Sequence, residues 1–133
     1  MTSICRDHDF SLIQLVTPTT PPERAVQIAR TSTGFLYYVS VTGITGERRE
    51  LPPQVLDQVG WLRQQTDLPI CIGFGISRPE QVQMLAPVAD GVIVGSALVR
   101  HLAEVDSKGS AQVLQDIGQL VDQLLGALKS SKP

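Results

Sequence analysis

Four short apolar runs alternate along the chain with longer stretches of helical spacing. The runs cover residues 11–17, 35–41, 70–73 and 92–94. They are apolar almost throughout instead of alternating with polar residues, which is typical of strands that are covered on both faces. The pattern therefore predicts four strands of a parallel sheet.

The stretches between these runs predict helices. Thr20 with Glu23, and Ser77 with Glu80, have the spacing of capping boxes, so we expect helices at 23–31 and 77–86. We also expect helices at 52–66, 96–102 and 111–129, with a polar link at 106–110. Two of these helices carry apolar stripes: Val55, Val59 and Leu62 in the first, and Leu114, Ile117, Val121, Leu124 and Leu128 in the last.

The predicted elements alternate between strand and helix four times, and a further helix closes the chain. This order predicts a parallel sheet with right-handed crossovers. No linker-like composition interrupts this order, so residues 1–133 are expected to form a single domain. Glycines follow the strands, which fits the (β/α)8 barrel, because its sites lie at the carboxyl ends of its strands. Such a barrel has eight units and about 250 residues. This chain supplies four units, so the predicted fold class is α/β, half of a TIM (β/α)8 barrel plus a C-terminal helix.

Composition narrows the classes of function. The net charge is −2 and no basic run occurs, which argues against a nucleic-acid partner. No apolar segment approaches the roughly 20 residues of a membrane span, and residues 1–10 do not resemble a signal peptide. We interpret Cys5 and Cys71 as reduced thiols of a cytoplasmic protein. His8 and His101 are isolated along the chain, so we predict no metal site.

Three predicted strand ends share a glycine beside which a ligand could approach the backbone closely: Thr45-Gly46, Phe74-Gly75 and Gly95-Ser96. In a parallel sheet these ends lie at the same rim. Gly95-Ser96 also opens a helix, whose first N–H groups and positive dipole end attract an anion. The pattern predicts a phosphate site, although a tight turn would explain each glycine taken alone.

Groups for acid–base catalysis are scarce. The charges at 47–50 lie in a loop, where solvated side chains are ordinary, and we interpret Asp90 as a turn residue. No pair of carboxylates lies at the predicted strand ends, as acid–base catalysis would require. Tyr37 and Phe74 could line an apolar pocket, and for Tyr37 a place in the core is equally favoured.

Three segments carry a resemblance to a known family: GFLYYVSVTGITGERRELP, LPICIGFGISRPEQV and ADGVIVGSALV. Together they closely resemble the tryptophan synthase alpha chain, from its fifth barrel strand onward. The resemblance implies a lyase of tryptophan biosynthesis that cleaves indole-3-glycerol phosphate to indole and glyceraldehyde 3-phosphate. It implies no metal and no organic cofactor. It also implies a partner, the pyridoxal-phosphate-dependent beta chain that receives the indole.

The resemblance also assigns site residues. The substrate phosphate would be held by Gly46, Gly75, Gly95 and Ser96. The indole side would be lined by Tyr37, Thr45 and Phe74, with Thr45 on a loop that closes over the substrate.

The chain departs from the family at the acid–base pair. That pair is a glutamate and an aspartate near the second barrel strand, and this chain has no counterpart of either. Proton transfer by one positioned group is worth roughly 10²–10⁴-fold, so we expect at most residual lyase activity from this chain alone. A second hypothesis is an inactive half-barrel or truncated fragment that keeps only the phosphate site. A third, a thiazole-synthase-like barrel, is disfavoured by the run YVSVTGITG.

The predicted sheet ends in two open edges, at residues 11–17 and 92–94. Such edges invite pairing with another chain. The sequence leaves open whether a second copy of this chain or a complementing half-barrel completes the fold.

Overall fold

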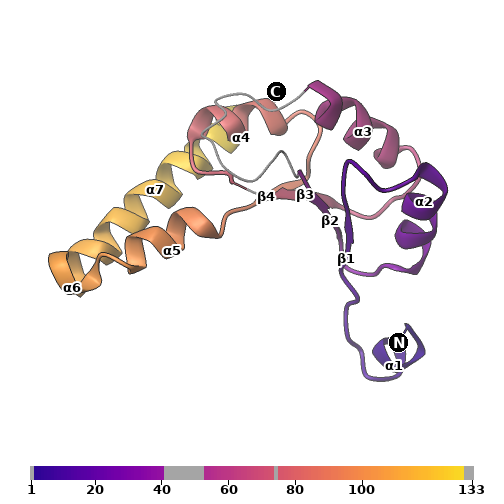
Figure 1. The fold of residues 1–133 in the computed structure, drawn as a ribbon, viewed down its shortest axis with the longest axis horizontal. Helices are drawn as coiled ribbons and strands as arrows, with labels where there is room; N and C mark the ends of the chain where they lie inside the picture. The colour runs from indigo at the N-terminus through magenta and orange to yellow at the C-terminus, as the bar shows by residue number, and fades with distance from the viewer. Residues whose placement is uncertain (1, 41–52, 74, 131–133) are drawn as a thin grey trace.

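The computed structural model describes residues 2–40, 53–73 and 75–130. Their elements are, in order, α1 (Thr2–Asp7), β1 (Gln14–Val16), α2 (Pro22–Thr31), β2 (Leu36–Val39), α3 (Pro53–Arg63), β3 (Ile70–Gly73), α4 (Pro79–Leu85), β4 (Gly91–Ile93), α5 (Ser96–Leu102), α6 (Val105–Lys108) and α7 (Ser110–Ser130). Figure 1 shows α2, α3 and α4 along one side of the sheet, with α5, α6 and α7 extending past β4.

Within the described residues the strands form one sheet of four, in the order β1-β2-β3-β4. Each strand pairs in parallel with the next. Sequential order with parallel pairing requires a crossover between every two strands, and α2, α3 and α4 supply these crossovers. The prediction of four parallel βα units and a C-terminal helix is confirmed.

The hydrophobic core lies between the sheet and its helix layer. The strand residues that face it are at most 3% exposed: Val16, Leu36, Tyr38, Ile70 and Ile72. From the helices, α3 contributes its predicted stripe, and each residue of that stripe is at most 1% exposed: Val55, Val59 and Leu62. These alternate strand positions belong to one face, so the other face is free of this packing.

The opposite face of the sheet remains accessible. The register aligns Leu15, Tyr37, Cys71 and Gly91 in one row across it. None of the four is buried, and Leu15 is 53% exposed. In a closed (β/α)8 barrel, inward-pointing positions of this kind fill the interior.

Some elements differ from the prediction. α1 and the single turn α6 were not expected, and α6 occupies part of the predicted polar link. Both are short and carry no apolar stripe, so periodicity could not reveal them. β1 is shorter than predicted because Leu12 lies outside the ladder. Its backbone N–H donates to Thr33 Oγ1 at 2.6 Å, and its carbonyl accepts from Thr33 N–H at 2.9 Å.

The two predicted capping boxes do not form as expected. Thr20 Oγ1 accepts from the backbone N–H of Thr17 at 2.9 Å, and α2 has no side-chain cap. At α4 the Oε1 of Gln81 accepts from the backbone N–H groups of Ser77 and Arg78, at 2.9 and 3.1 Å. Both helices nevertheless begin close to the predicted residues, because proline occupies the first helical position of each.

The apolar stripe predicted for α7 is only partly right. Leu124 is 5% exposed, but Leu114 and Val121 are 67% and 36% exposed. Val113 and Ala127 are buried instead. The helix is apolar on two sides, and its period does not reveal which side packs against α4.

Candidate functional site

The carboxyl ends of β3 and β4 meet at one rim of the sheet. β3 ends at Gly73 and β4 at Ile93, and these two residues are register partners. Gly75 and Gly95 each follow two residues later, so both predicted glycines begin the loops that leave this rim. Gly75, Gly95 and Ser96 are all exposed.

The space beside these glycines is open. A Cβ atom added to Gly75 or to Gly95 would meet no heavy atom within 4 Å. Gly75 has φ +72°, a left-handed conformation that glycine adopts without strain. Gly95 precedes α5, and its carbonyl accepts from the N–H groups of Leu98 and Val99, at 3.0 and 3.1 Å. The first N–H groups of such a helix have no intrahelical partner, so they can bind an anion.

Tyr37 lies on the open face, next to this rim. A Cβ atom added to Gly73 would stand 2.8 Å from both the Cε2 and the hydroxyl oxygen of Tyr37, so the phenol ring lies over Gly73. Tyr37 is half-buried, whereas Tyr38 faces the helices and is 1% exposed. Tyr38 therefore packs in the core between the sheet and the helices, and Tyr37 lies on the opposite face of the sheet.

The remaining predicted site residues cannot be placed in this rim. Thr45, Gly46 and Phe74, and the charged residues at 47–50, lie outside the described residues. Their roles stay predictions.

Asp90 does more than make a turn. Its Oδ2 atom accepts from Arg63 Nη2 at 2.7 Å and from the backbone N–H of Ile70 at 2.8 Å. It therefore joins the end of α3 to the start of β3. Burial raises the pKa of the neighbouring Cys71 thiol, and the charge of Asp90 adds to this effect. Both cysteines of the chain are free.

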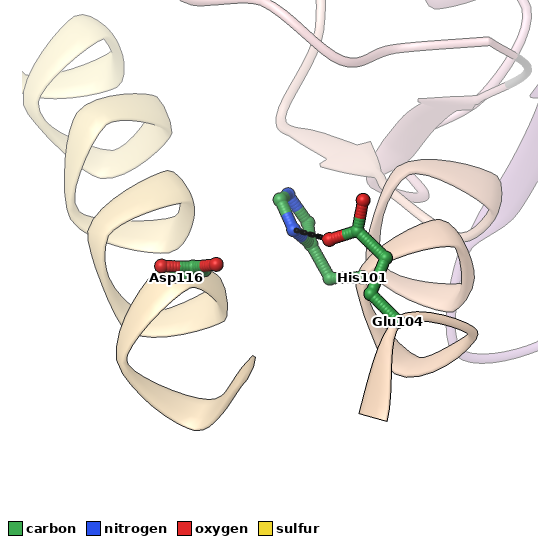
Figure 2. Close-up of side chains that lie close together, drawn as sticks. All are labelled: His101, Glu104 and Asp116. Carbon is green, nitrogen blue, oxygen red and sulfur yellow. Dashed lines mark ion pairs between the residues drawn. The ribbon is translucent and has the colours of Figure 1, made fainter. Parts of the chain in front are cut away.

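A second group of ionisable side chains lies between α5 and α7. Figure 2 shows His101 and Glu104 facing Asp116, which projects from α7. One ligand atom from each residue lies within 4.8 Å of the others. The prediction that His101 is isolated is therefore wrong, because two carboxylates lie close to it in the folded chain. It failed because Asp116 is distant in sequence and no short motif marks it.

Lys108 bridges the two carboxylates of this group. Its Nζ lies 2.8 Å from Glu104 Oε2 and 3.3 Å from Asp116 Oδ2. The hydrogen bond from Lys108 holds the pKa of the Glu104 carboxyl below its ordinary value. The hydrogen bond from Gln112 does the same for the pKa of Asp116, assisted by Lys108. Because an ammonium group already supplies the positive charge, we interpret the group as an ion-pair network between α6 and α7.

A cavity of about 380 Å³ lies on the other side of the sheet, between α2 and α3. There the Tyr38 hydroxyl donates to Gln58 Oε1, and Gln58 Nε2 donates to the carbonyl of Pro18 at 3.3 Å. Burial raises the pKa of Tyr38 to about 12. This cavity opens on the helix layer, so it is separate from the open face that carries Tyr37.

None of the described helices is long and apolar enough to cross a membrane.

Comparisons with known proteins give one family. The family model described as tryptophan synthase alpha chain matches residues 1–129. A tryptophan synthase alpha chain of Rhodopirellula baltica is 62% identical over 111 residues, which are 84% of this chain and 40% of that protein. One of Chloroflexus aggregans is 50% identical over 99 residues, or 74% of this chain and 37% of that protein.

Solved structures agree with the sequence comparisons. Tryptophan synthase subunit alpha of Legionella pneumophila superposes with a TM-score of 0.78 at 33% identity, covering 97% of this chain and 46% of that chain. A chain of the tryptophan synthase α2β2 complex of Pyrococcus furiosus gives a TM-score of 0.80 at 35% identity, covering 94% and 49%. This chain thus spans less than half the length of its relatives, and its fold corresponds to about half of their TIM barrel. With a family model, close relatives and solved structures in agreement, the chain belongs to the tryptophan synthase alpha chain family.

Proposed function

We propose that this chain is the phosphate-binding half of a lyase that cleaves indole-3-glycerol phosphate to indole and glyceraldehyde 3-phosphate in tryptophan biosynthesis. The observation that carries the proposal is the register of β3 and β4. It ends both strands at one rim, immediately before Gly75, Gly95 and Ser96. Membership of the family supplies the substrate class. The chain acts as a single cytoplasmic domain over residues 1–133, without cofactor.

In this proposal the phosphate lies at the rim. Gly75 and Gly95 leave room for the phosphate oxygens beside the backbone, and Gly46 completes the site from the loop after β2. The first N–H groups of α5 and the hydroxyl of Ser96 donate hydrogen bonds to it. The partial positive charge at the start of α5 favours the anion further.

The indole lies toward the open face. Tyr37 presents its ring there, above Gly73, at the end of the sheet from which the phosphate loops leave. Phe74 follows Gly73 directly in sequence, and Thr45 belongs to the loop that closes over the substrate. An apolar aromatic wall beside an anion site suits a substrate that joins an indole ring to a glycerol phosphate.

The acid–base pair comes from outside this chain. Cleavage adds a proton to the indole carbon and removes one from a glycerol hydroxyl, so it requires two positioned groups. Among the described residues, Asp90 is bonded to Arg63 and Ile70. Glu104 and Asp116 both pair with Lys108. The chain alone is therefore expected to show at most residual lyase activity.

The scarcity of candidate acid–base groups in this chain favours a second candidate function. The chain would then be an inactive half-barrel that binds phosphate and acts only in association with another chain. In either case its open sheet edges would take a second copy or a complementing half-barrel. The beta chain is the proposed partner of the completed enzyme, since one solved relative is an α2β2 complex.

Calorimetry with glycerol 3-phosphate tests the phosphate site. Replacing Gly95 by Asp should weaken binding at least tenfold, because a carboxylate would face the phosphate in space that is now open. Gly118→Asp is the matched control, since Gly118 is also exposed with nothing within 4 Å but lies on α7. If Gly95→Asp binds glycerol 3-phosphate as the parent chain does, the phosphate assignment is wrong.

A further inference from the structure

Three side chains that can bind a metal ion converge between α5 and α7 (Figure 2). His101 lies in the last turn of α5, and Glu104 follows it by three residues. The backbone N–H of Glu104 donates to the carbonyl of His101 at 3.1 Å, and this turn brings both side chains to the same side. Asp116 projects toward them from α7. One ligand atom of each residue lies within 4.8 Å of the other two.

The Nδ1 atom of His101 is buried, and among the described residues it has no hydrogen-bond partner. Glu104 Oε2 lies 3.7 Å from it, beyond hydrogen-bond distance. A buried polar atom without a partner is unusual, because it has given up its hydrogen bond with water. Two ligand atoms of a tetrahedral zinc ion stand about 3.4 Å apart, since each lies about 2.0–2.2 Å from the metal. The spacing of Nδ1 and Oε2 is therefore close to that of two ligands of one ion.

Lys108 shows that this group attracts positive charge. Its Nζ lies 2.8 Å from Glu104 Oε2 and 3.3 Å from Asp116 Oδ2. The ammonium reaches both carboxylates but leaves His101 Nδ1 without a partner. A metal ion can bind all three groups at once. The side chain of Lys108 is 43% exposed, so it can withdraw into water when an ion takes its place.

The surroundings also suit a bound ion. Gln112 Nε2 donates to Asp116 Oδ1 at 2.8 Å, which leaves Asp116 Oδ2 directed at Lys108. Metal-binding carboxylates are commonly oriented by such a hydrogen bond. A cavity of about 320 Å³ borders His101 and Glu104. It has room for a water molecule as a fourth ligand, which completes a tetrahedral site with three protein ligands.

We propose that His101, Glu104 and Asp116 bind a zinc ion in place of the Lys108 ammonium. The ligand atoms are Nδ1 of the histidine and one oxygen of each carboxylate, and small side-chain rotations bring them to the spacing that zinc requires. An imidazole ligand favours zinc over Mg²⁺ and Ca²⁺, which prefer oxygen ligands. Two carboxylates balance the charge of the ion, so the ammonium is expelled. The ion joins the end of α5 to α7.

This inference departs from the sequence prediction of no metal site, which rested on the isolation of His101. It does not depend on the lyase proposal, because none of the three ligands is a proposed substrate residue.

Calorimetric titration of the whole chain with zinc chloride at neutral pH tests the site. The parent should bind one zinc ion through these ligands. His101→Gln and Asp116→Asn should each weaken binding by about tenfold or more, because each removes one ligand. Circular dichroism should show that both variants are folded. His8→Gln is the matched control, since His8 is the other histidine of the chain and is exposed.

Lys108→Met separates a zinc site from an ion-pair network that binds no metal. It should tighten zinc binding by about threefold or more, because exposed ion pairs are weak but must be broken when zinc enters. Lys129→Met should leave the affinity unchanged, since Lys129 is exposed in the last turn of α7.

NMR of the imidazole nitrogens gives a readout that needs no variant. Zinc should shift the Nδ1 signal of His101 and leave both nitrogen signals of His8 in place. A parent chain that binds no zinc, or that binds it equally well as His101→Gln, would overturn the proposal. So would a loss of binding in His8→Gln, which would place the ion near the N-terminus, or an affinity that Lys108→Met leaves unchanged or lowers.

Discussion

Gly73 leaves the space that the Tyr37 ring occupies at the rim of the sheet. Its missing side chain leaves room for the phenol ring on the open face, and Ile93 closes the same space from β4. The position therefore couples the packing of three strands to the orientation of one proposed site residue. Glycine is required here by close approach, because an added Cβ would meet Tyr37 and Ile93 within 2.9 Å.

We expect Gly73→Ala to destabilise the chain by about 1–3 kcal/mol, the usual cost of overfilling a packed site. Urea unfolding followed by circular dichroism measures the difference. Gly118→Ala should instead stabilise by about 0.5–1 kcal/mol, because Gly118 lies inside α7 with open space around its Cα. Equal or greater stability of Gly73→Ala would show that the Tyr37 ring does not lie over Gly73.

The α6 turn shows how an element can depend on charges rather than on apolar packing. It contains no buried residue, and Lys108 ties it to Glu104 and Asp116. The Glu104 pKa is lowered in the folded chain. Its contribution to stability is therefore present above the ordinary pKa of 4.5 and is lost as the pH falls through the lower folded value.

Lys108→Met should bring the Glu104 pKa back toward 4.5, because it removes the hydrogen bond that lowers it. A carbon-detected NMR titration of the Glu104 carboxyl measures this shift. The stability of the variant should also depend less on pH between about 6 and 3. Lys129→Met is the control, since Lys129 is exposed in the last turn of α7. An unchanged Glu104 pKa in Lys108→Met would refute the network.

Strands and long helices could be predicted because their determinants are local. Apolar runs and first-turn prolines mark β2, β3, α2 and α4 in the sequence itself. The carboxylate contacts could not be predicted in the same way. Asp90 binds Arg63 across 27 residues, and His101 meets Asp116 through the packing of α5 on α7. Such contacts exist only once the elements have packed.

The parts of the candidate site that depend on local sequence and strand order could also be predicted. Glycines after strands, together with parallel order, place Gly75 and Gly95 at one rim, and the register agrees with this. Choosing between Tyr37 and Tyr38 for the core required the structure, because adjacent residues of a strand point to opposite faces. Both residues are aromatic, so composition could not assign either to a face.

At the scale of the whole sheet, this chain corresponds to about half of the barrel that its relatives form. Among the described residues, the four-stranded sheet carries the proposed phosphate rim at the carboxyl ends of β3 and β4. The acid–base pair that the resemblance implies has no counterpart in the sequence of this chain. Phosphate binding and turnover should therefore separate, with binding retained by this chain and turnover dependent on another.

Indole release from indole-3-glycerol phosphate tests this separation most directly. It should be measured for the chain alone and after mixing with the separately produced first half of the Rhodopirellula baltica alpha chain, the relative that is 62% identical. We predict no indole above the uncatalysed rate from the chain alone, and indole release from the mixture. A rate near that of a complete alpha chain from this chain alone would contradict the account, as would a mixed complex that forms but releases no indole.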